Sequence, residues 1–232
     1  MRMPIRAAFS RTIALCALLS LSMAGSGYAQ ESIKKVVYSK MYEESPVAIL
    51  IMPPINETNH VEAQDYFFST LTMPLVEKGF YVFSPYLAME LLRQESAGDA
   101  EQFLEGNLKP FYDVFQADAV LFTIIKNWSK AALVSTVSVE VEYILRSAKT
   151  NEELFRRSAD VSVDCSVSSG NGILIDMLAN SLATAATDKV VAARKANAFI
   201  LEDMPHGKYS PKGGRDGADR VGAQHLTGIT VK

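Results

Sequence analysis

Acidic residues of two neighbouring segments come closest to a spacing that could do chemistry. Asp160 and Asp164 flank Ser162 in one segment, and the segment before it carries Glu140 and Glu142 on one face. Paired carboxylates can bind a cation or exchange protons with a substrate. The same alternation is typical of the solvent-facing side of a β-hairpin. We favour the solvated face and keep, as the alternative function, a small periplasmic hydrolase or ligand-binding protein that uses this carboxylate-lined surface.

The loop at residues 53–57, Pro-Pro-Ile-Asn-Glu, is the best candidate for a binding surface. It follows an apolar run at residues 47–52, and α/β folds commonly place binding loops at the carboxyl ends of buried strands. Asn56 and Glu57 offer hydrogen-bonding groups there and are predicted as binding residues. The prolines also end the strand and Asn59 can cap the next helix, so loop structure alone explains the same pattern.

No other motif supports catalysis or metal binding. His60, His206 and His225 are far apart, whereas a zinc site needs several converging nitrogen or sulfur ligands. Ser32 and Lys35 have the spacing of a Ser-x-x-Lys nucleophile but lack its partner motifs. We therefore predict no metal, no cofactor and no catalytic residue, and we expect that the protein is not an enzyme.

The first 29 residues have the pattern of a secretory signal peptide. Three arginines precede an apolar run at residues 12–21, and small residues then lead to Ala29. We predict cleavage between Ala29 and Gln30 and an exported, periplasmic protein, with outer-membrane association left open. Lipidation is the second interpretation, although Cys16 follows Leu15 inside the apolar run and lacks the small residue that acylation requires.

Charge and cysteine content narrow the possible partners. Cleavage removes three Arg and no acidic residue, which leaves 20 Lys and Arg against 26 Asp and Glu. An acidic chain argues against nucleic-acid binding, because such proteins concentrate positive charge. Cys165 is then the one remaining cysteine, so no disulfide can form within the chain, and we expect this thiol to be buried.

The amino-terminal half alternates strands and helices. Apolar runs at residues 47–52, 80–83 and 119–128 predict buried strands of a sheet that is parallel in this half. A helix begins after Asn59 with a capping-box-like start at Glu62, and its predicted inward residues are Phe67, Leu71 and Leu75. A second helix opens at Pro85, and its predicted buried residues are Leu87, Leu91 and Leu92.

The carboxyl-terminal half begins with a hairpin. Residues 137–145 and 154–165 alternate apolar and polar side chains around a polar turn, which predicts two long antiparallel strands. A long helix is predicted at about residues 173–200. The fold class is therefore an α/β (α+β) two-layer sandwich with helices packed on a mixed sheet. We divide the chain into a signal peptide at 1–29, one domain at 30–203, and an extended or disordered tail at 204–232.

Three ordered blocks, at residues 49–57, 72–85 and 115–121, resemble a family of bacterial lipoproteins of unknown function, as does the closing Met-Pro-His-Gly-Lys-Tyr at 204–209. The resemblance implies a fold similar to the periplasmic domain of CsgG and to the amino-terminal domains of LpoB and TolB, which bind proteins in the envelope. Family members are typically tethered by a lipidated Cys near their start. The poor context of Cys16 is a departure from that pattern.

These observations favour an exported, non-catalytic envelope protein, a protein-interaction subunit or accessory factor of an outer-membrane or secretion-type assembly. Its expected partners are envelope proteins, including CsgG-like or other outer-membrane lipoproteins, and not nucleic acid. The free edge of the hairpin offers a second hypothesis, in which the chain forms a homo-oligomer by strand pairing.

Overall fold

Seven strands form one mixed sheet in the computed structural model, which describes residues 32–130, 136–165 and 185–232. The sheet order is β3-β1-β4-β5-β6-β7, and β2 pairs with β4. The strands are β1 (Ala48–Ile51), β2 (Ile55–Asn56), β3 (Tyr81–Val82), β4 (Ala119–Lys130), β5 (Thr136–Ser147), β6 (Glu153–Asp164) and β7 (His225–Val231). The predicted signal peptide lies outside the described residues, as do residues 173–184 of the predicted long helix.

The strand directions confirm the predicted mixed sheet. β1 pairs in parallel with β3 and β4, and β2 also runs parallel to β4. β4, β5 and β6 are antiparallel neighbours, so the predicted long hairpin is present. β6 then pairs in parallel with β7. The alternation of residues 137–145 is confirmed as well, since their odd-numbered side chains are all buried.

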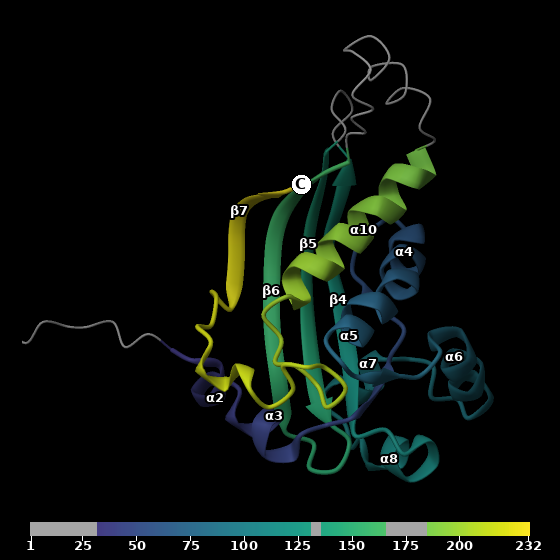
Figure 1. Ribbon diagram of the computed structural model, residues 1–232. Helices are drawn as coiled ribbons and strands as arrows, with labels where there is room; N and C mark the ends of the chain where they lie inside the picture. Colours follow the sequence, from purple (N-terminus) through teal and green to yellow (C-terminus); the bar gives the residue numbers. More distant parts are fainter. Residues whose placement is uncertain (1–31, 131–135, 166–184) are drawn as a thin grey trace, which may run out of the picture. The chain divides into compact units, whose positions relative to one another are not determined.

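Helices pack on both faces of the sheet (Figure 1). Helices α4, α5 and α10 cover one face and build the larger apolar core, whereas α6 and α8 cover part of the other face with a smaller core. The helices are α2 (Lys34–Val37), α3 (Ser39–Glu44), α4 (Glu62–Thr70), α5 (Thr72–Glu77), α6 (Pro85–Gln94), α7 (Glu101–Leu104), α8 (Lys109–Phe115), α10 (Ala185–Leu201) and the 3-10 helix η2 (Asp216–Ala218). Within the described ranges no helix is long and apolar enough to cross a membrane.

The first predicted helix is confirmed with a different start. Its inward residues are fully buried, as the spacing predicts: Phe67, Leu71 and Leu75. The helix divides at Leu71 into α4 and α5, three residues before Pro74, and Gly79 follows α5 with a φ of +89°. The predicted capping box is wrong, because α4 begins at Glu62 with no side-chain cap.

The predictions for β3 and α6 need correction. The strand at residues 80–83 was expected to be buried, but β3 lies at the edge of the sheet and Tyr81 is 54% exposed. Helix α6 begins at Pro85 as predicted and buries Leu92. Leu87 and Leu91, however, are 63% and 42% exposed, since the sheet contacts only the opposite side of this helix.

The predicted tail at residues 204–232 is instead ordered and packed on the domain. Met204 is fully buried, η2 follows in this segment, and β7 pairs with β6 from Ser158 to Val163. This pairing also corrects the expectation that the hairpin has a free edge, because β7 covers β6 on that side. Among the described strands, β3 and β7 stand at the two ends of the sheet order.

A cysteine, a tryptophan and an asparagine side chain complete the core. Cys165 is 3% exposed, which confirms its predicted burial, and Trp128, also 3% exposed, is part of the core as well. Asn197 of α10 is fully buried, and it accepts a hydrogen bond from the Tyr143 hydroxyl and donates one to the Thr70 hydroxyl at 2.8 Å. This amide therefore joins α10 to β5 and α4.

Candidate functional site

The predicted binding residues Asn56 and Glu57 lie where β2 leaves the sheet. Asn56 Oδ1 accepts hydrogen bonds from the Thr58 backbone N–H at 3.0 Å and hydroxyl at 2.8 Å, while Nδ2 donates to the His60 carbonyl at 2.8 Å. Glu57 is exposed, and its backbone N–H donates to the Ile125 carbonyl at 3.0 Å. The Asn56 amide thus orders its own loop, and the binding role of these two residues stays a prediction.

Glu142, on the acidic face of the hairpin, is held by two cations. Lys126 Nζ lies 2.6 Å from Glu142 Oε2, and the Arg156 guanidinium donates to Oε1. Burial alone would raise the pKa of Glu142, but these two partners outweigh burial and hold the pKa below its ordinary value. Glu142 is therefore ionised and committed to ion pairs within the sheet.

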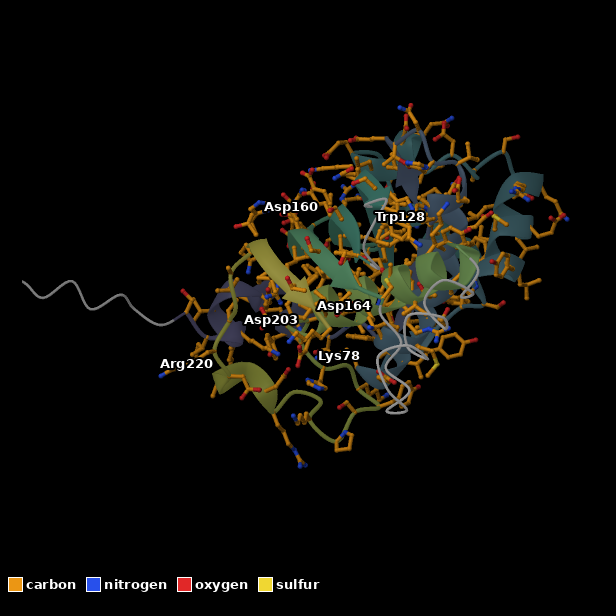
Figure 2. The ribbon with its side chains drawn as sticks, turned by 90° about the horizontal axis from the view of Figure 1, so that it is seen from above. Lys78, Trp128, Asp160, Asp164, Asp203 and Arg220 are labelled. Carbon is orange, nitrogen blue, oxygen red and sulfur yellow. The ribbon has the colours of Figure 1, made fainter. Side chains whose placement is uncertain are left out.

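Glu140, Asp160 and Asp164 lie on the sheet face opposite α10. Glu140 and Asp160 are cross-strand partners, while Asp164 stands opposite Thr136 at the end of the hairpin. Figure 2 shows Asp160 and Asp164 on the same strand. Like charges directly opposite each other on a sheet repel unless solvent or a partner screens them. The arrangement fits the favoured interpretation of a solvated face.

Asp216 is a buried carboxylate that sequence reasoning missed, with an exposure of 3%. Its Oδ1 accepts a hydrogen bond from the Tyr42 hydroxyl at 3.0 Å, and its Oδ2 accepts from the His206 backbone N–H at 3.0 Å. The His206 ring nitrogen and Lys34 Nζ lie 2.9 and 3.6 Å from the same oxygen. Burial alone would raise the pKa of Asp216, but the hydrogen bonds and the Lys34 charge hold it below its ordinary value.

Asp203 organises a second polar cluster nearby. Its Oδ2 accepts hydrogen bonds from the Tyr38 hydroxyl and the Gly222 backbone N–H, both at 3.2 Å, and the Arg157 guanidinium lies 3.3 Å away. Gln224 donates to the Tyr38 oxygen at 3.0 Å. Burial is the main cause that raises the pKa of Tyr38 to about 12. The cluster therefore ties the junction of α2 and α3, strand β6 and the carboxyl-terminal segment together.

The carboxyl-terminal segment is also fixed by its backbone. The Gly207 N–H donates to the Lys78 carbonyl at 2.8 Å, and the Tyr209 N–H donates to the Gly79 carbonyl at 2.9 Å. A Cβ at Gly79 would lie 2.2 Å from the backbone nitrogen of Ser210, so only glycine permits this approach. Figure 2 shows Lys78 beside this segment. The buried carboxylates and these backbone contacts hold distant segments of the chain together. We call this region the clasp; it consists of Lys34, Tyr38, Tyr42, Lys78, Gly79, Asp203, residues 204–209 and Asp216.

The remaining candidates do not converge on a site. In the part of the chain that the structure describes, no group of three or more His, Cys, Asp or Glu could hold a metal ion. His225 lies 2.7 Å from the Ser158 hydroxyl on the exposed end of β7. The Ser32 carbonyl accepts a hydrogen bond from the Val221 N–H at 2.9 Å, while Lys35 is exposed on α2.

Helix α6 has two apolar sides. Ala88 and Leu92 are buried against the sheet, whereas Leu87, Leu91 and Tyr86 are exposed by 63%, 42% and 53%. We call these three exposed residues the α6 surface. Exposed carboxylates are concentrated on α6, on α7 and in their connections: Glu90, Glu95, Asp99, Glu101 and Glu105. Helix α6 thus has an exposed apolar face in a stretch of the chain whose exposed charges are mostly acidic.

Residues 36–206 match the family model described as "Putative lipoprotein GNA1162-like". The chain belongs to this family. It is 26% identical over 168 residues to the putative lipoprotein NMB1124/NMB1162 of Neisseria meningitidis serogroup B (strain ATCC BAA-335 / MC58), with 71% of this chain and 78% of that protein covered. Membership in a lipoprotein family makes this chain an exported protein of the cell envelope.

Solved structures show similar chains. The crystal structure of lipoprotein GNA1162 from Neisseria meningitidis has a TM-score of 0.45 and 25% identity, and covers 60% of this chain and 100% of that one. The LpoB carboxyl-terminal domain from Escherichia coli has a TM-score of 0.36 and 17% identity, with coverages of 54% and 93%. The PelC dodecamer from Paraburkholderia phytofirmans has a TM-score of 0.35 and 14% identity, with coverages of 71% and 91%.

The family model confirms the resemblance to a lipoprotein family that the sequence showed, and the structure shows which elements the resembling blocks form. Residues 49–57 form β1, β2 and the loop between them, residues 72–85 form α5 and β3, and residues 115–121 lead into β4. The closing residues 204–209 lie in the clasp. Sequence periodicity missed the clasp because its partners are distant in the chain, with Tyr42 and Asp216 separated by 174 positions.

Proposed function

We propose that this protein is a non-catalytic, periplasmic component of the cell envelope that binds another envelope protein through the α6 surface. The observation that carries the proposal is the exposure of Leu87 and Leu91, which are neighbours on one turn of the helix. A surface helix usually has one apolar side facing its own core. Because α6 has a second apolar side, it is suited to a second neighbour.

The charges around α6 favour a protein partner. Residues 85–108 carry five exposed carboxylates and a single basic residue, Arg93. An anionic membrane surface would repel this acidic stretch, since like charges across an interface are costly. A partner with an apolar anchor and a basic rim fits it. Interfaces of this type have an apolar centre and a polar rim.

The use of the buried polar groups supports a structural role rather than catalysis. Asp216 and Asp203 each bind three or more groups from separate segments, and Asn197 joins helices to the sheet. A catalytic acid or base needs a free position beside its substrate. These groups instead hold the domain rigid, which suits a scaffold that presents a contact surface.

Signal-peptide cleavage between Ala29 and Gln30 remains part of the proposal, with lipidation at Cys16 as its rival. Cleavage places the mature chain in the periplasm, while acylation would anchor the chain to the outer membrane. Mass spectrometry of the protein from envelope fractions separates the two outcomes. A mature chain that begins at Gln30 supports cleavage, and a diacylated or triacylated Cys16 contradicts it.

The α6 proposal is tested with a matched pair of double variants. L87S/L91S removes the apolar face, while V61S/V76S replaces two exposed apolar residues outside α6, which are 80% and 47% exposed. Each variant is expressed at native level, cross-linked in cells and purified from the envelope. We expect a defined cross-linked complex for the wild type and the valine variant and its loss in L87S/L91S. An unchanged complex in L87S/L91S contradicts the proposal.

A further inference from the structure

Residues 207–220 overlap the clasp in sequence and carry an exposed basic surface. Successive backbone hydrogen bonds from Ser210 to Gly207, Gly213 to Ser210 and Arg215 to Lys212 fold the segment into tight turns. The exposed side chains that result are Lys208, Tyr209, Lys212, Arg215 and Arg220, and Tyr209 is 65% exposed. We call these five residues the basic loop. It contrasts with the chain as a whole, whose formal net charge is −3.

The acidic residues of the same segment neutralise only part of this positive charge. Asp216 is buried and turned inward to Tyr42, His206 and Lys34, so its charge is used inside the clasp. Asp219 is exposed. Cations therefore dominate the outer surface of the loop, because its buried carboxylate is already paired.

The described chain enters the domain at this surface. Ile33 forms an isolated β-bridge with Arg220, and the backbone N–H of Lys34 donates to the Asp219 carbonyl at 2.9 Å. The Val221 N–H donates to the Ser32 carbonyl at 2.9 Å. In Figure 1 the yellow carboxyl-terminal segment passes beside α2 and α3 before it reaches β7. The first described residues and the basic loop thus form one end of the domain.

We propose that the basic loop docks on the anionic headgroups of a phospholipid membrane. Two observations agree on this occupant: the cations are exposed, and an exposed tyrosine lies among them. Lys and Arg bind anionic headgroups, and tyrosine is enriched at the boundary between headgroups and acyl chains. The inference needs the envelope location but not the α6 partner.

The expected strength of this contact is modest. Each Lys or Arg close to an anionic membrane improves partitioning roughly five-fold, so three residues together contribute on the order of a hundred-fold. Such a contact is reversible by itself. A second attachment, by lipid or by a bound partner, would make it persistent because it raises the local concentration at the membrane. The loop then also orients the domain.

Vesicle sedimentation tests the proposal with the chain from Gln30 onward, since residues 32–232 form one compact unit. Vesicles of phosphatidylcholine and phosphatidylglycerol in a roughly equal mixture, whose anionic headgroups attract Lys and Arg, are compared with pure phosphatidylcholine vesicles. The test variant is K208E/K212E/R215E. The control is R93E/K109E/K232E, which makes the same charge change at exposed residues outside the loop. Circular dichroism confirms that both variants remain folded.

We expect salt-sensitive binding of the wild type and the control to the anionic vesicles only. The loop variant should lose more than about a hundred-fold in partitioning, because it removes three cations and adds three anions, and Tyr209→Ser should weaken binding less. Equal sedimentation of the loop variant and the control, or no binding of the wild type to anionic vesicles, overturns the proposal. L87S/L91S should bind vesicles like the wild type, so failure here is distinct from failure of the α6 proposal.

Discussion

The α6 surface and the clasp are built in opposite ways. In the clasp, charged groups such as Asp216 and Lys34 are buried and paired, with side-chain exposures of 1% and 6%. In α6, apolar groups such as Leu87 are exposed and the charges stay in solvent. The first arrangement fixes distant segments of one chain to each other. The second leaves a surface free for another molecule, so the contrast separates structural residues from contact residues.

Asp216→Ala should cause the largest loss in the free energy of unfolding. The change leaves Lys34 buried without its counter-charge and removes an acceptor from Tyr42 and His206. We expect a loss of about 3–5 kcal/mol in the free energy of unfolding, measured by urea denaturation. Asp219→Asn, at an exposed position three residues away, should change it by less than about 0.5 kcal/mol. Equal effects of both changes would show that the clasp is not a structural element.

Gly79→Ala should have the next largest effect. Alanine is strained at a φ of +89°, and its Cβ would lie 2.2 Å from the Ser210 nitrogen. We expect a loss of about 3 kcal/mol in thermal or urea unfolding. Gly214 also has a positive φ of +67°, but open space surrounds its Cβ position. Gly214→Ala should therefore cost only about 1 kcal/mol, and a similar cost at both glycines contradicts the close packing of this segment.

Alanine substitutions of two adjacent leucines of α6 should change the free energy of unfolding by very different amounts. Leu92 is 1% exposed, and Leu92→Ala should lower the free energy of unfolding by about 2–3 kcal/mol. Leu91 is 42% exposed, and Leu91→Ala should change it by less than about 0.5 kcal/mol. Urea denaturation of both variants gives the comparison directly. A large loss at Leu91 would mean that the helix has no free face.

A smaller effect is expected in the pH dependence of the free energy of unfolding, to which Asp216 contributes. The pKa of Asp216 is depressed in the folded protein, so its contribution to stability is present above its unfolded pKa and is lost as pH falls through the folded value. The gap in unfolding free energy between the wild type and Asp216→Asn should therefore narrow below about pH 4, near the ordinary aspartate pKa. Denaturation at pH 7, 5, 4 and 3 measures this gap. A gap that widens toward acid pH contradicts the assigned direction.

The fold was largely predictable where one local rule decides it. Alternation at residues 137–145 specified the hairpin, and the apolar run at 47–52 specified β1. Periodicity could not tell Leu91 from Leu92, because adjacent positions of a helix point only about 100° apart and packing decides which of the two is covered. The broad apolar pattern of α6 was visible in the sequence, but its free side was not.

The candidate site was less predictable than the fold. The segment after residue 204 lacks apolar periodicity, so its composition suggested an unfolded tail. Its order comes from buried carboxylates whose partners, such as Tyr38 and Tyr42, lie at the other end of the chain. No local pattern reports such pairing. Asn56 was correctly located in a loop, but its amide is occupied by neighbouring residues.

Site-specific photo-cross-linking in cells tests the central claim most directly. A photoreactive amino acid replaces Leu87 on α6, Lys212 on the basic loop, or Lys109 on α8, all of which are exposed. The account predicts one defined protein adduct from position 87, and neither position 212 nor position 109 yields that adduct. No protein adduct from position 87, or the same adduct from all three positions, would contradict it.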